Sequence, residues 1–183
     1  MDTGRLSLRG WRKGDEEGFA RMNSDVEVME YYPRTLSGEE SDALAVRFDS
    51  LIKKNGWGFW AVELKREEKF IGFIGLNRPT YDLPVKPCVE IGWRLAKEYW
   101  GKGYATEGAK MALKFAFQEL ELNRVYSFTP VLNQRSQAVM ERIGMKNVSQ
   151  NFMHPLVPAH SPLSEHVLYE ISKKEYSAKE ASS

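Results

Sequence analysis

A glycine-bearing loop constrains this chain most, because it stands between a strand pattern and an amphipathic helix. Residues 99–107 read Tyr-Trp-Gly-Lys-Gly-Tyr-Ala-Thr-Glu. Gly101 and Gly103 can adopt backbone angles that other residues avoid, and they have no side chain to obstruct a ligand. Consecutive N–H groups in such a loop can converge on phosphate oxygens, and the helix that follows adds its positive dipole end. The loop indicates an anion-binding site, although an ordinary strand-to-helix turn explains two glycines equally well.

The hydrophobic pattern on both sides of the loop predicts an α/β domain with a mixed, mainly antiparallel sheet. Runs of β-branched and aromatic residues predict strands, and apolar residues spaced three or four apart predict helices. The predicted strands cover residues 6–11, 57–64, 70–76, 88–95, 124–129, 148–153 and 166–171. The predicted helices comprise one that begins at residue 15 and others over residues 28–32, 37–52, 106–120 and 133–143. The proline-rich segment 79–87 is expected to be a surface loop.

Length and composition fit a single domain. The chain has 183 residues, of which 42% are hydrophobic and 28% are charged, as in ordinary globular proteins. We expect residues 1–173 to form that domain and residues 174–183 to form a flexible tail. Twenty-six basic and 25 acidic residues leave a net charge of +1, so no bulk field favours nucleic acid or an anionic membrane as a partner. Any phosphate recognition must therefore be local.

The sequence predicts neither a membrane anchor nor a metal site. No apolar run approaches the roughly 20 residues that span a bilayer, and residues 1–5 lack a secretory apolar core, so we expect a cytoplasmic protein. Cys88 is the only cysteine, which excludes a disulfide or a multi-cysteine zinc site within one chain. His154, His160 and His166 are spaced six apart, which fits no compact zinc arrangement on one helix.

The predicted strand 88–95 has two different faces. Val89, Ile91 and two further apolar residues alternate with Glu90 and Gly92, so Glu90 lies on the less apolar side. A carboxylate in a partly dry cleft has a raised pKa, which suits it to accept a proton near neutral pH. A solvated or ion-paired strand glutamate is the alternative interpretation.

Asn133 and Ser136 begin a later predicted helix. Asn133 is placed to cap the first turn, and its amide could also bind a ligand. Ser136 lies on the first turn with apolar residues three, four and seven positions later, so its hydroxyl should face inward. An inward hydroxyl needs a partner, which is either a backbone carbonyl or a ligand atom.

Three segments in this order resemble the GNAT superfamily of acyl-CoA-dependent N-acetyltransferases. They are Glu-Ile-Gly at 90–92, the glycine loop, and Asn-Gln-Arg-Ser-Gln-Ala-Val-Met-Glu-Arg-Ile-Gly-Met at 133–145. Within the superfamily the chain is most similar to the RimJ/RimL branch, named for enzymes that acetylate the amino termini of ribosomal proteins. The resemblance spans about residues 6–172. It implies a sheet of about seven strands flanked by helices, with splayed central strands that form the CoA cleft.

The resemblance implies that the loop holds the CoA pyrophosphate. The family pattern is Gln or Arg, two residues, Gly, one residue, then Gly or Ala, and Gly103 and Ala105 match its last two positions. Trp100 stands at the first position, where the superfamily prefers Gln or Arg and this branch commonly carries Trp. The implied cofactor-binding residues of the loop are Trp100, Gly101, Lys102, Gly103, Tyr104, Ala105 and Thr106.

The resemblance also implies how the rest of the site is arranged. The backbone of Leu95 would pair with the pantetheine arm, Asn133 would contact pantetheine, and Ser136 would lie near the thioester sulfur. The acceptor pocket would be bordered by Tyr31, Tyr32, the loop 79–87 and the segment 154–166.

These features predict an N-acetyltransferase that transfers acetyl from acetyl-CoA to a primary amine, such as a protein N-terminal α-amine, by direct attack. An amine with a pKa of about 10.4 is mostly protonated at pH 7 and cannot attack a thioester, so a base is needed. Glu90 is the candidate base, directly or through water. A thiolate with a pKa of about 8.5 leaves readily, so loss of Ser136 should matter less than loss of Glu90. We expect a monomer or a homodimer.

Three other functions are compatible with parts of this pattern. The acceptor could be a small metabolite or antibiotic amine, or the chain could be a catalytically silent CoA-binding sensor. Glu90 and Ser136 argue against the sensor, because binding alone requires neither of them. A nucleotide-binding module is disfavoured because the lysine and serine or threonine of a phosphate-binding P-loop are missing after the glycines.

Overall fold

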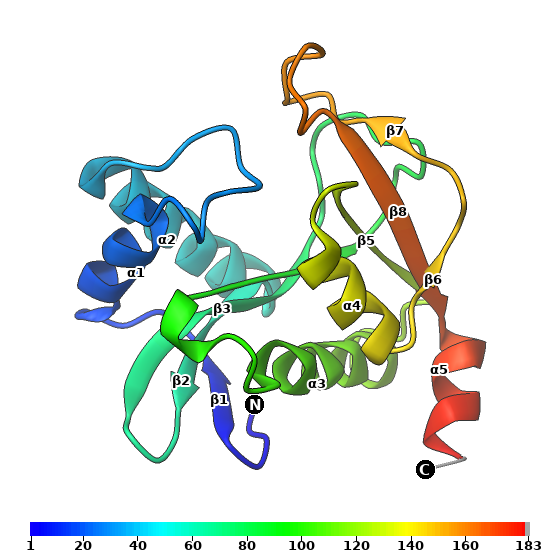
Figure 1. The fold of residues 1–183 in the computed structure, drawn as a ribbon. Coiled ribbons are helices and arrows are strands. Elements are labelled where there is room, and N and C mark those ends of the chain that lie inside the picture. Colours follow the sequence, from blue (N-terminus) through cyan, green and yellow to red (C-terminus); the bar gives the residue numbers. More distant parts are fainter. Residues whose placement is uncertain (182–183) are drawn as a thin grey trace.

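The computed structural model describes residues 1–181, in which a mixed eight-stranded sheet is flanked by helices (Figure 1). The strands are β1 (Leu6–Arg9), β2 (Phe59–Leu64), β3 (Lys69–Asn77), β4 (Glu90–Leu95), β5 (Arg124–Pro130), β6 (Lys146–Asn147), β7 (Phe152–Met153) and β8 (Glu165–Ser172). The helices are α1 (Asp15–Ser24), α2 (Gly38–Asn55), α3 (Tyr104–Gln118), α4 (Gln134–Arg142) and α5 (Lys173–Glu180), with a short 3-10 helix over Lys97–Tyr99. The predicted fold class, a mainly antiparallel α/β sheet with flanking helices, is confirmed.

The sheet divides between β4 and β5. Its strand order is β1-β2-β3-β4-β5-β8-β6, with β7 also paired to β8. Neighbours are antiparallel except β4 and β5, which are parallel and share a single registered pair, Glu90 with Tyr126. Since β4 continues to Leu95 without a partner on that side, the two strands diverge after their first residues. Figure 1 shows the consequence: β1 to β3 with α1 and α2 lie at left, and β5 and β8 lie at right.

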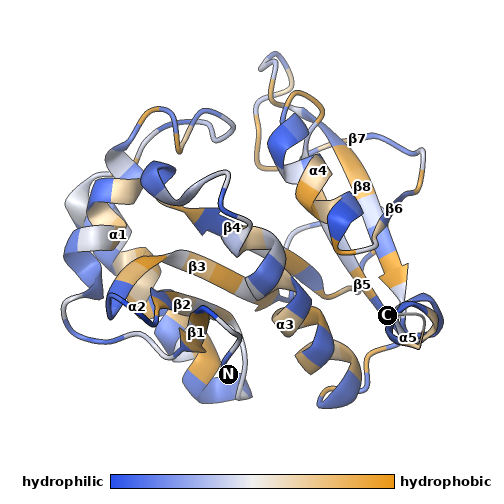
Figure 2. Ribbon diagram, turned by 60° about the horizontal axis from the view of Figure 1, so that its bottom comes forward, coloured by the Kyte–Doolittle hydropathy of each residue, from blue (hydrophilic) through white to orange (hydrophobic). Residues whose placement is uncertain are grey.

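Helices cover both faces of the first half of the sheet. On one face α3 packs through Ala109, Ala112 and Ala116, all fully buried. This helix lies so close that a Cβ on Gly108 would stand 2.4 Å from Ile74 Cδ1. On the other face α1 and α2 bury a second cluster that includes Phe73 of β3. The central β3 is therefore hydrophobic along most of its length, as Figure 2 shows.

Three predicted elements differ in the structure. Residues 28–32 form consecutive turns instead of a helix. The single strand predicted over 148–153 is replaced by β6 and β7, because Ser149 between them has a left-handed φ of 56°. The segment predicted as a flexible tail from residue 174 carries the helix α5 up to residue 180; residues 182 and 183 lie outside the described residues.

The helix α5 has a clear physical cause. Ser172 and Glu175 cap its first turn reciprocally, and the ring of Tyr176 lies 4.9 Å from that of Phe117 on α3. None of the helices in residues 1–181 is both long enough and apolar enough to cross a membrane.

Candidate active site

The glycine loop and the start of α4 enclose a cavity of about 690 Å³, which we call the loop cavity. It lies where β4 and β5 diverge. Lys102 is outside it, because its Nζ turns to within 5.5 Å of the centre of the Tyr99 ring. The other residues predicted to bind the cofactor all line it: Leu95, Trp100, Gly101, Gly103, Tyr104, Ala105, Thr106 and Asn133.

The loop has the backbone that an anion site needs. Gly101 and Gly103 have φ angles of 72° and 79°, the left-handed region that favours glycine. Gly103 is the N-cap of α3 and offers no side-chain cap, while Glu107 N–H already bonds Gly103 O at 3.0 Å. The first-turn amides of an α-helix before that point have no intrahelical acceptor. The N-terminus of α3 therefore presents N–H groups and a positive dipole end to the loop cavity.

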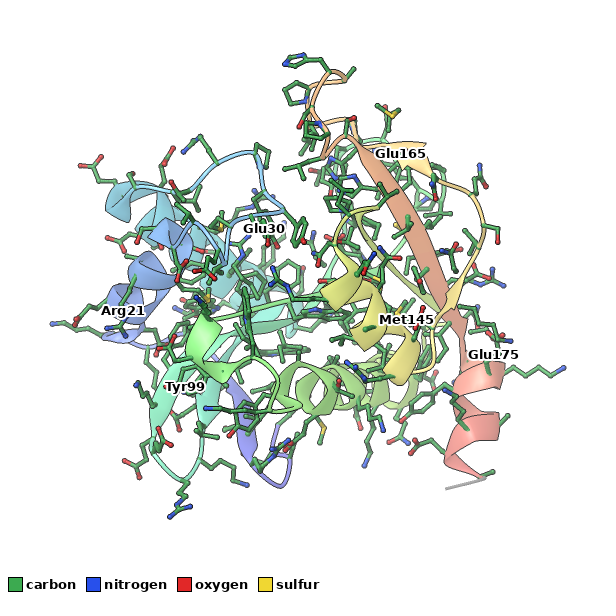
Figure 3. All side chains as sticks on the ribbon, in the orientation of Figure 1. Arg21, Glu30, Tyr99, Met145, Glu165 and Glu175 are labelled. Carbon is green, nitrogen blue, oxygen red and sulfur yellow. The ribbon has the colours of Figure 1, made fainter. Side chains whose placement is uncertain are left out.

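Trp100 braces the loop. Its Nε1–H donates to Leu95 O at 2.8 Å, which ties the loop to the end of β4. The guanidinium of Arg135 on α4 lies 4.4 Å above its ring, and Arg135 also pairs with Glu30 Oε2 at 2.6 Å. The labelled Glu30 lies at the tip of the loop between α1 and α2, on the side of α4 (Figure 3). Since Trp100 occupies Leu95 O, a ligand that pairs with this backbone must use the Leu95 N–H or the second lone pair of its carbonyl.

A second cavity of about 440 Å³ adjoins the first, and we call it the Glu90 cavity. It lies on the face of β4 that carries Glu90 and Arg94, which is the face covered by α1 and α2. Residues that line both cavities mark where they meet: Tyr31, Tyr32, Trp93, Arg94, Asn133 and Ser136. The predicted borders of the acceptor pocket also reach this cavity through Tyr81 of the loop 79–87 and His154.

Glu90 has the electrostatics of a general base. Burial raises the pKa of its carboxyl to about 7, although a hydrogen bond from Asn77 Nδ2 to Oε1 at 2.7 Å opposes this shift. Asn77 stands directly opposite Glu90 on β3. Burial, and then the charge of Glu90, raise the pKa of the nearby Tyr81 hydroxyl, which therefore stays protonated at neutral pH. A carboxyl with a pKa near the working pH exchanges protons efficiently.

Asn133 caps α4 and also holds Ser136. Its Oδ1 accepts from Ser136 N–H at 3.1 Å, as the capping prediction requires. Its Nδ2 donates to Thr129 Oγ1 at 2.9 Å and to Ser136 Oγ at 3.1 Å. The Ser136 oxygen thus accepts from a side-chain amide, an acceptor role that is separate from the backbone carbonyl or ligand atom expected to accept its O–H. Its own O–H remains available toward the cavities.

His154, His166 and Cys88 are wholly or partly buried, whereas His160 is exposed. The rings of His154 and His166 lie 4.7 Å apart, and burial, with the neighbouring His166, lowers the pKa of His154 to about 4. His154 Nδ1 accepts from Leu156 N–H at 3.2 Å, a bond to backbone. Burial and the charge of Glu90 raise the pKa of Cys88 to about 11, so its thiol is not a ready nucleophile. Residues 1–181 contain no cluster of three or more metal-ligating side chains.

Sequence reasoning missed two residues of the Glu90 cavity. Asn77 is a polar residue at the end of an otherwise apolar strand, and its pairing with Glu90 depends on register. Arg94 follows Glu90 by four positions on the same face, a signal visible in the strand alternation. Neither residue had a predicted role.

Comparisons with known proteins agree with this geometry. A family model described as an acetyltransferase (GNAT) domain matches residues 5–146. The uncharacterized N-acetyltransferase YnaD of Bacillus subtilis is 30% identical over 96% of this chain and 98% of its own. FsC-acetyl coenzyme A-N(2)-transacetylase of Aspergillus fumigatus is 29% identical over 96% of this chain and 77% of its own. The putative ribosomal N-acetyltransferase YdaF of Bacillus subtilis is 51% identical over 55 residues, which are 30% of each chain.

Solved structures show the same fold. A GNAT-family acetyltransferase from Bacillus anthracis superimposes with a TM-score of 0.79 at 27% identity, covering 96% of this chain and 99% of that one. Spermidine N-acetyltransferase from Vibrio cholerae, solved with CoA and spermine, has a TM-score of 0.74 at 21% identity, covering 95% of this chain and 99% of that one.

Proposed function

Because this chain belongs to the GNAT acetyltransferase family, we propose that it moves an acetyl group from acetyl-CoA directly to a primary amine, with Glu90 as the base. The family uses acetyl-CoA as co-substrate, and the chain is an N-acetyltransferase. One observation carries the role of Glu90. Its carboxyl has a pKa near 7 and lines a cavity that adjoins the loop cavity.

The loop cavity fits the donor. Gly101 and Gly103 open the backbone at the N-terminus of α3, and the amides there suit a pyrophosphate. Leu95 and Asn133 line the same cavity and Asn133 also lines the Glu90 cavity, so pantetheine would extend past them toward Glu90. When bound, acetyl-CoA supplies the thioester carbonyl that the amine attacks.

The chemistry assigned to this chain is proton removal and charge stabilisation. Glu90 accepts a proton from the acceptor ammonium, directly or through water, and the freed nitrogen lone pair forms the new C–N bond. Backbone N–H groups of β4 stabilise the oxyanion. The C–S bond then breaks and the thiolate leaves and takes up a proton, a step that the nearby Ser136 hydroxyl assists only modestly. No covalent acyl-enzyme is formed.

Two classes of acceptor are candidates. Similarity to the RimJ/RimL branch, together with the partial match to YdaF, favours a protein N-terminal α-amine. A small amine is favoured by the Glu90 cavity, because 440 Å³ lies within the range of small-molecule pockets.

The acetyl transfer is tested with purified protein, acetyl-CoA and a panel of amines, peptides and ribosomal proteins. We expect release of free thiol and an acetylated amine by mass spectrometry. Labelled acetyl-CoA added to a cell lysate with the protein identifies the acceptor without a guess. Absence of turnover across the whole panel contradicts the proposal and favours a CoA-binding sensor.

A further inference from the structure

The Glu90 cavity contains two arginines that pair with no carboxylate in the described residues. Arg94 projects from β4 on the same face as Glu90, and Arg47 reaches the cavity from α2. The side chain of Arg47 makes no hydrogen bond or ion pair within residues 1–181, and the side chain of Arg94 donates only to the neutral amide of Asn23. A cavity that binds an amine through one carboxylate thus also carries two positive charges.

Arg94 is held in place by neutral groups. Its Nη1–H donates to Asn23 Oδ1 at 2.6 Å, and the fully buried Asn23 in turn donates to Ser41 Oγ at 2.9 Å. Its guanidinium carbon lies 3.9 Å from the centre of the Tyr32 ring. Its Nε is buried and has no hydrogen-bond partner among the described residues. These contacts fix the guanidinium but leave its charge unneutralised, since neither an amide nor an aromatic ring is an anion.

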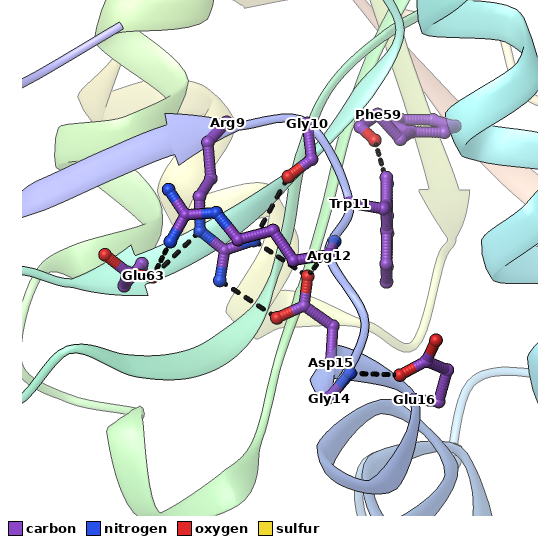
Figure 4. A network of polar contacts seen from close by, with 9 residues as sticks. All are labelled: Arg9, Gly10, Trp11, Arg12, Gly14, Asp15, Glu16, Phe59 and Glu63. Atoms are coloured by element: carbon purple, nitrogen blue, oxygen red, sulfur yellow. Dashed lines mark hydrogen bonds and ion pairs between the residues drawn. The ribbon is translucent and has the colours of Figure 1, made fainter.

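Other arginines of this chain contrast with Arg94. Arg9 lies between Asp15 and Glu63, with N–O distances of 2.7 and 2.8 Å (Figure 4). Arg135 pairs with Glu30 at 2.6 Å. A half-buried guanidinium normally gains a carboxylate in this way, because its desolvation is costly without one. The anion that Arg94 lacks in the chain is therefore expected from a ligand.

The geometry separates the two charges along one strand. Glu90 and Arg94 are four residues apart on the same face, which places their Cα atoms about 13 Å apart at the usual strand rise. Glu90 is the only carboxylate among the described residues that line this cavity, so a second ammonium would meet Arg94 or Arg47 instead of an acid. The second ammonium of a polyamine would be repelled by the guanidinium of Arg94 or Arg47, which disfavours polyamines as acceptors.

We propose that the acceptor is a small primary amine that carries an anionic carboxylate or phosphate group, bound by the Arg94 guanidinium while the amine lies at Glu90. The proposal rests on the acetyl transfer proposed above and names its substrate class. The planar guanidinium fork matches the oxygens of either anion. Arg47 adds charge at the α2 side of the cavity and favours entry of such a molecule.

The test uses a ladder of ω-amino carboxylates, from glycine to 6-aminohexanoate, each compared with its own carboxamide. Thiol release from acetyl-CoA gives kcat/KM for each. We expect at least one acid to exceed its carboxamide on the order of tenfold or more, as a charge-assisted hydrogen bond provides. An ω-aminoalkyl phosphate of the best length, compared with its alcohol, tells which anion is preferred.

Carboxamides or spermidine that react as well as every acid and phosphate overturn the proposal but leave the acetyl transfer intact. Failure of every amine to release thiol contradicts both.

Arg94 variants assign the discrimination to this side chain. Arg94→Gln should raise KM for the preferred anionic acceptor about tenfold or more and leave KM for the matching neutral amine unchanged, and Arg94→Lys should restore part of the preference. Arg78→Gln is the matched control, because Arg78 is exposed, lies outside both cavities and stacks on Trp57. If Arg94 had a purely structural role, Arg94→Gln would change KM equally for the anionic and the neutral acceptor and would lower the melting temperature. That result would overturn the assignment.

Discussion

At the scale of single residues, the proposed role of Glu90 as the base predicts how the rate depends on pH. Burial raises its pKa to about 7, so the base is increasingly protonated as the pH falls below that value. We expect kcat/KM to fall on the acidic side of pH 7. Glu90→Gln should lower kcat by about 100- to 10,000-fold and abolish this acidic limb, because general base catalysis contributes that much.

Rates measured between pH 5.5 and 9 check this expectation. Ser136→Ala is the comparison within the site and should cost less than Glu90→Gln, since the thiolate needs little help to leave. If Glu90→Gln kept the full rate at every pH, the base would have to be another group.

The same residue makes stability depend on pH. The folded pKa of Glu90 is raised from 4.5 to about 7, so the stability present below the unfolded pKa is lost as the pH rises through the folded one. Glutamine does not ionise. Glu90→Gln should therefore stabilise the protein at pH 8, by up to roughly 3 kcal/mol, and much less at pH 5.

Urea unfolding at both pH values measures the difference. Glu98→Gln serves as the control, because Glu98 is exposed. This substitution removes the same charge from a carboxylate that is not buried. An equal gain for Glu90→Gln at pH 5 and pH 8 would show that the ionised carboxylate is not what destabilises the fold.

At the scale of elements, the backbone conformation of the glycine loop bears directly on its proposed role in binding CoA. An alanine in the left-handed region costs about 1–2 kcal/mol, and Gly103 has a φ of 79°. Gly103→Ala should lower the free energy of unfolding by about 1 kcal/mol and raise KM for acetyl-CoA more than it lowers kcat, because it shifts the amides at the start of α3. Calorimetric binding of CoA measures the affinity directly.

The control is Gly10→Ala, where φ is not positive and an added methyl meets no atom within 4 Å. If both variants changed CoA affinity equally, the loop conformation would not matter for binding.

Elements with strong local signals were predictable from the sequence, and those set by other segments were not. The hairpin of β2 and β3, the loop and α3 all follow from periodicity and glycine placement. Residues 28–32 have apolar side chains at helical spacing, but Asp25 turns the chain by accepting the N–H of Glu27 at 2.8 Å, and Pro33 ends the segment. The polar composition of α5 suggested a tail, although the capping box of Ser172 and Glu175 was a readable signal for a helix.

At the scale of the whole molecule, the site exists because two halves of one sheet meet at a single point. The sequence predicted Glu90, Asn133 and the glycine loop, since each stands in a recognisable pattern. It could not predict that Arg94 would face α1 and α2 or that Asn77 would pair with Glu90, because strand neighbours and register depend on contacts between distant segments. The resemblance implied the splayed strands, and no local pattern encodes them.

Ser127 of β5 provides the last prediction, because it ties the two halves together beside the cavities. Its hydroxyl is buried and donates to Ile91 O at 2.9 Å, next to the single pair between β4 and β5. Ser127→Ala leaves that carbonyl without this donor and should cost about 1–3 kcal/mol of stability. Both cavities are bounded by β4, so a weaker contact between β4 and β5 also misplaces the amine relative to the thioester. We therefore expect kcat to fall.

Urea unfolding with and without CoA separates these effects. A ligand that binds only the native state raises the free energy of unfolding by about 2.7 kcal/mol at 100 times its Kd. If the cleft of Ser127→Ala is distorted, a fixed CoA concentration should therefore raise its free energy of unfolding by less than that of the original chain. Ser50→Ala, at an exposed position of α2, should leave both quantities unchanged. If Ser127→Ala is destabilised but keeps the full stabilisation by CoA and the full kcat, the hydrogen bond between Ser127 and Ile91 supports the fold without positioning the amine relative to the thioester.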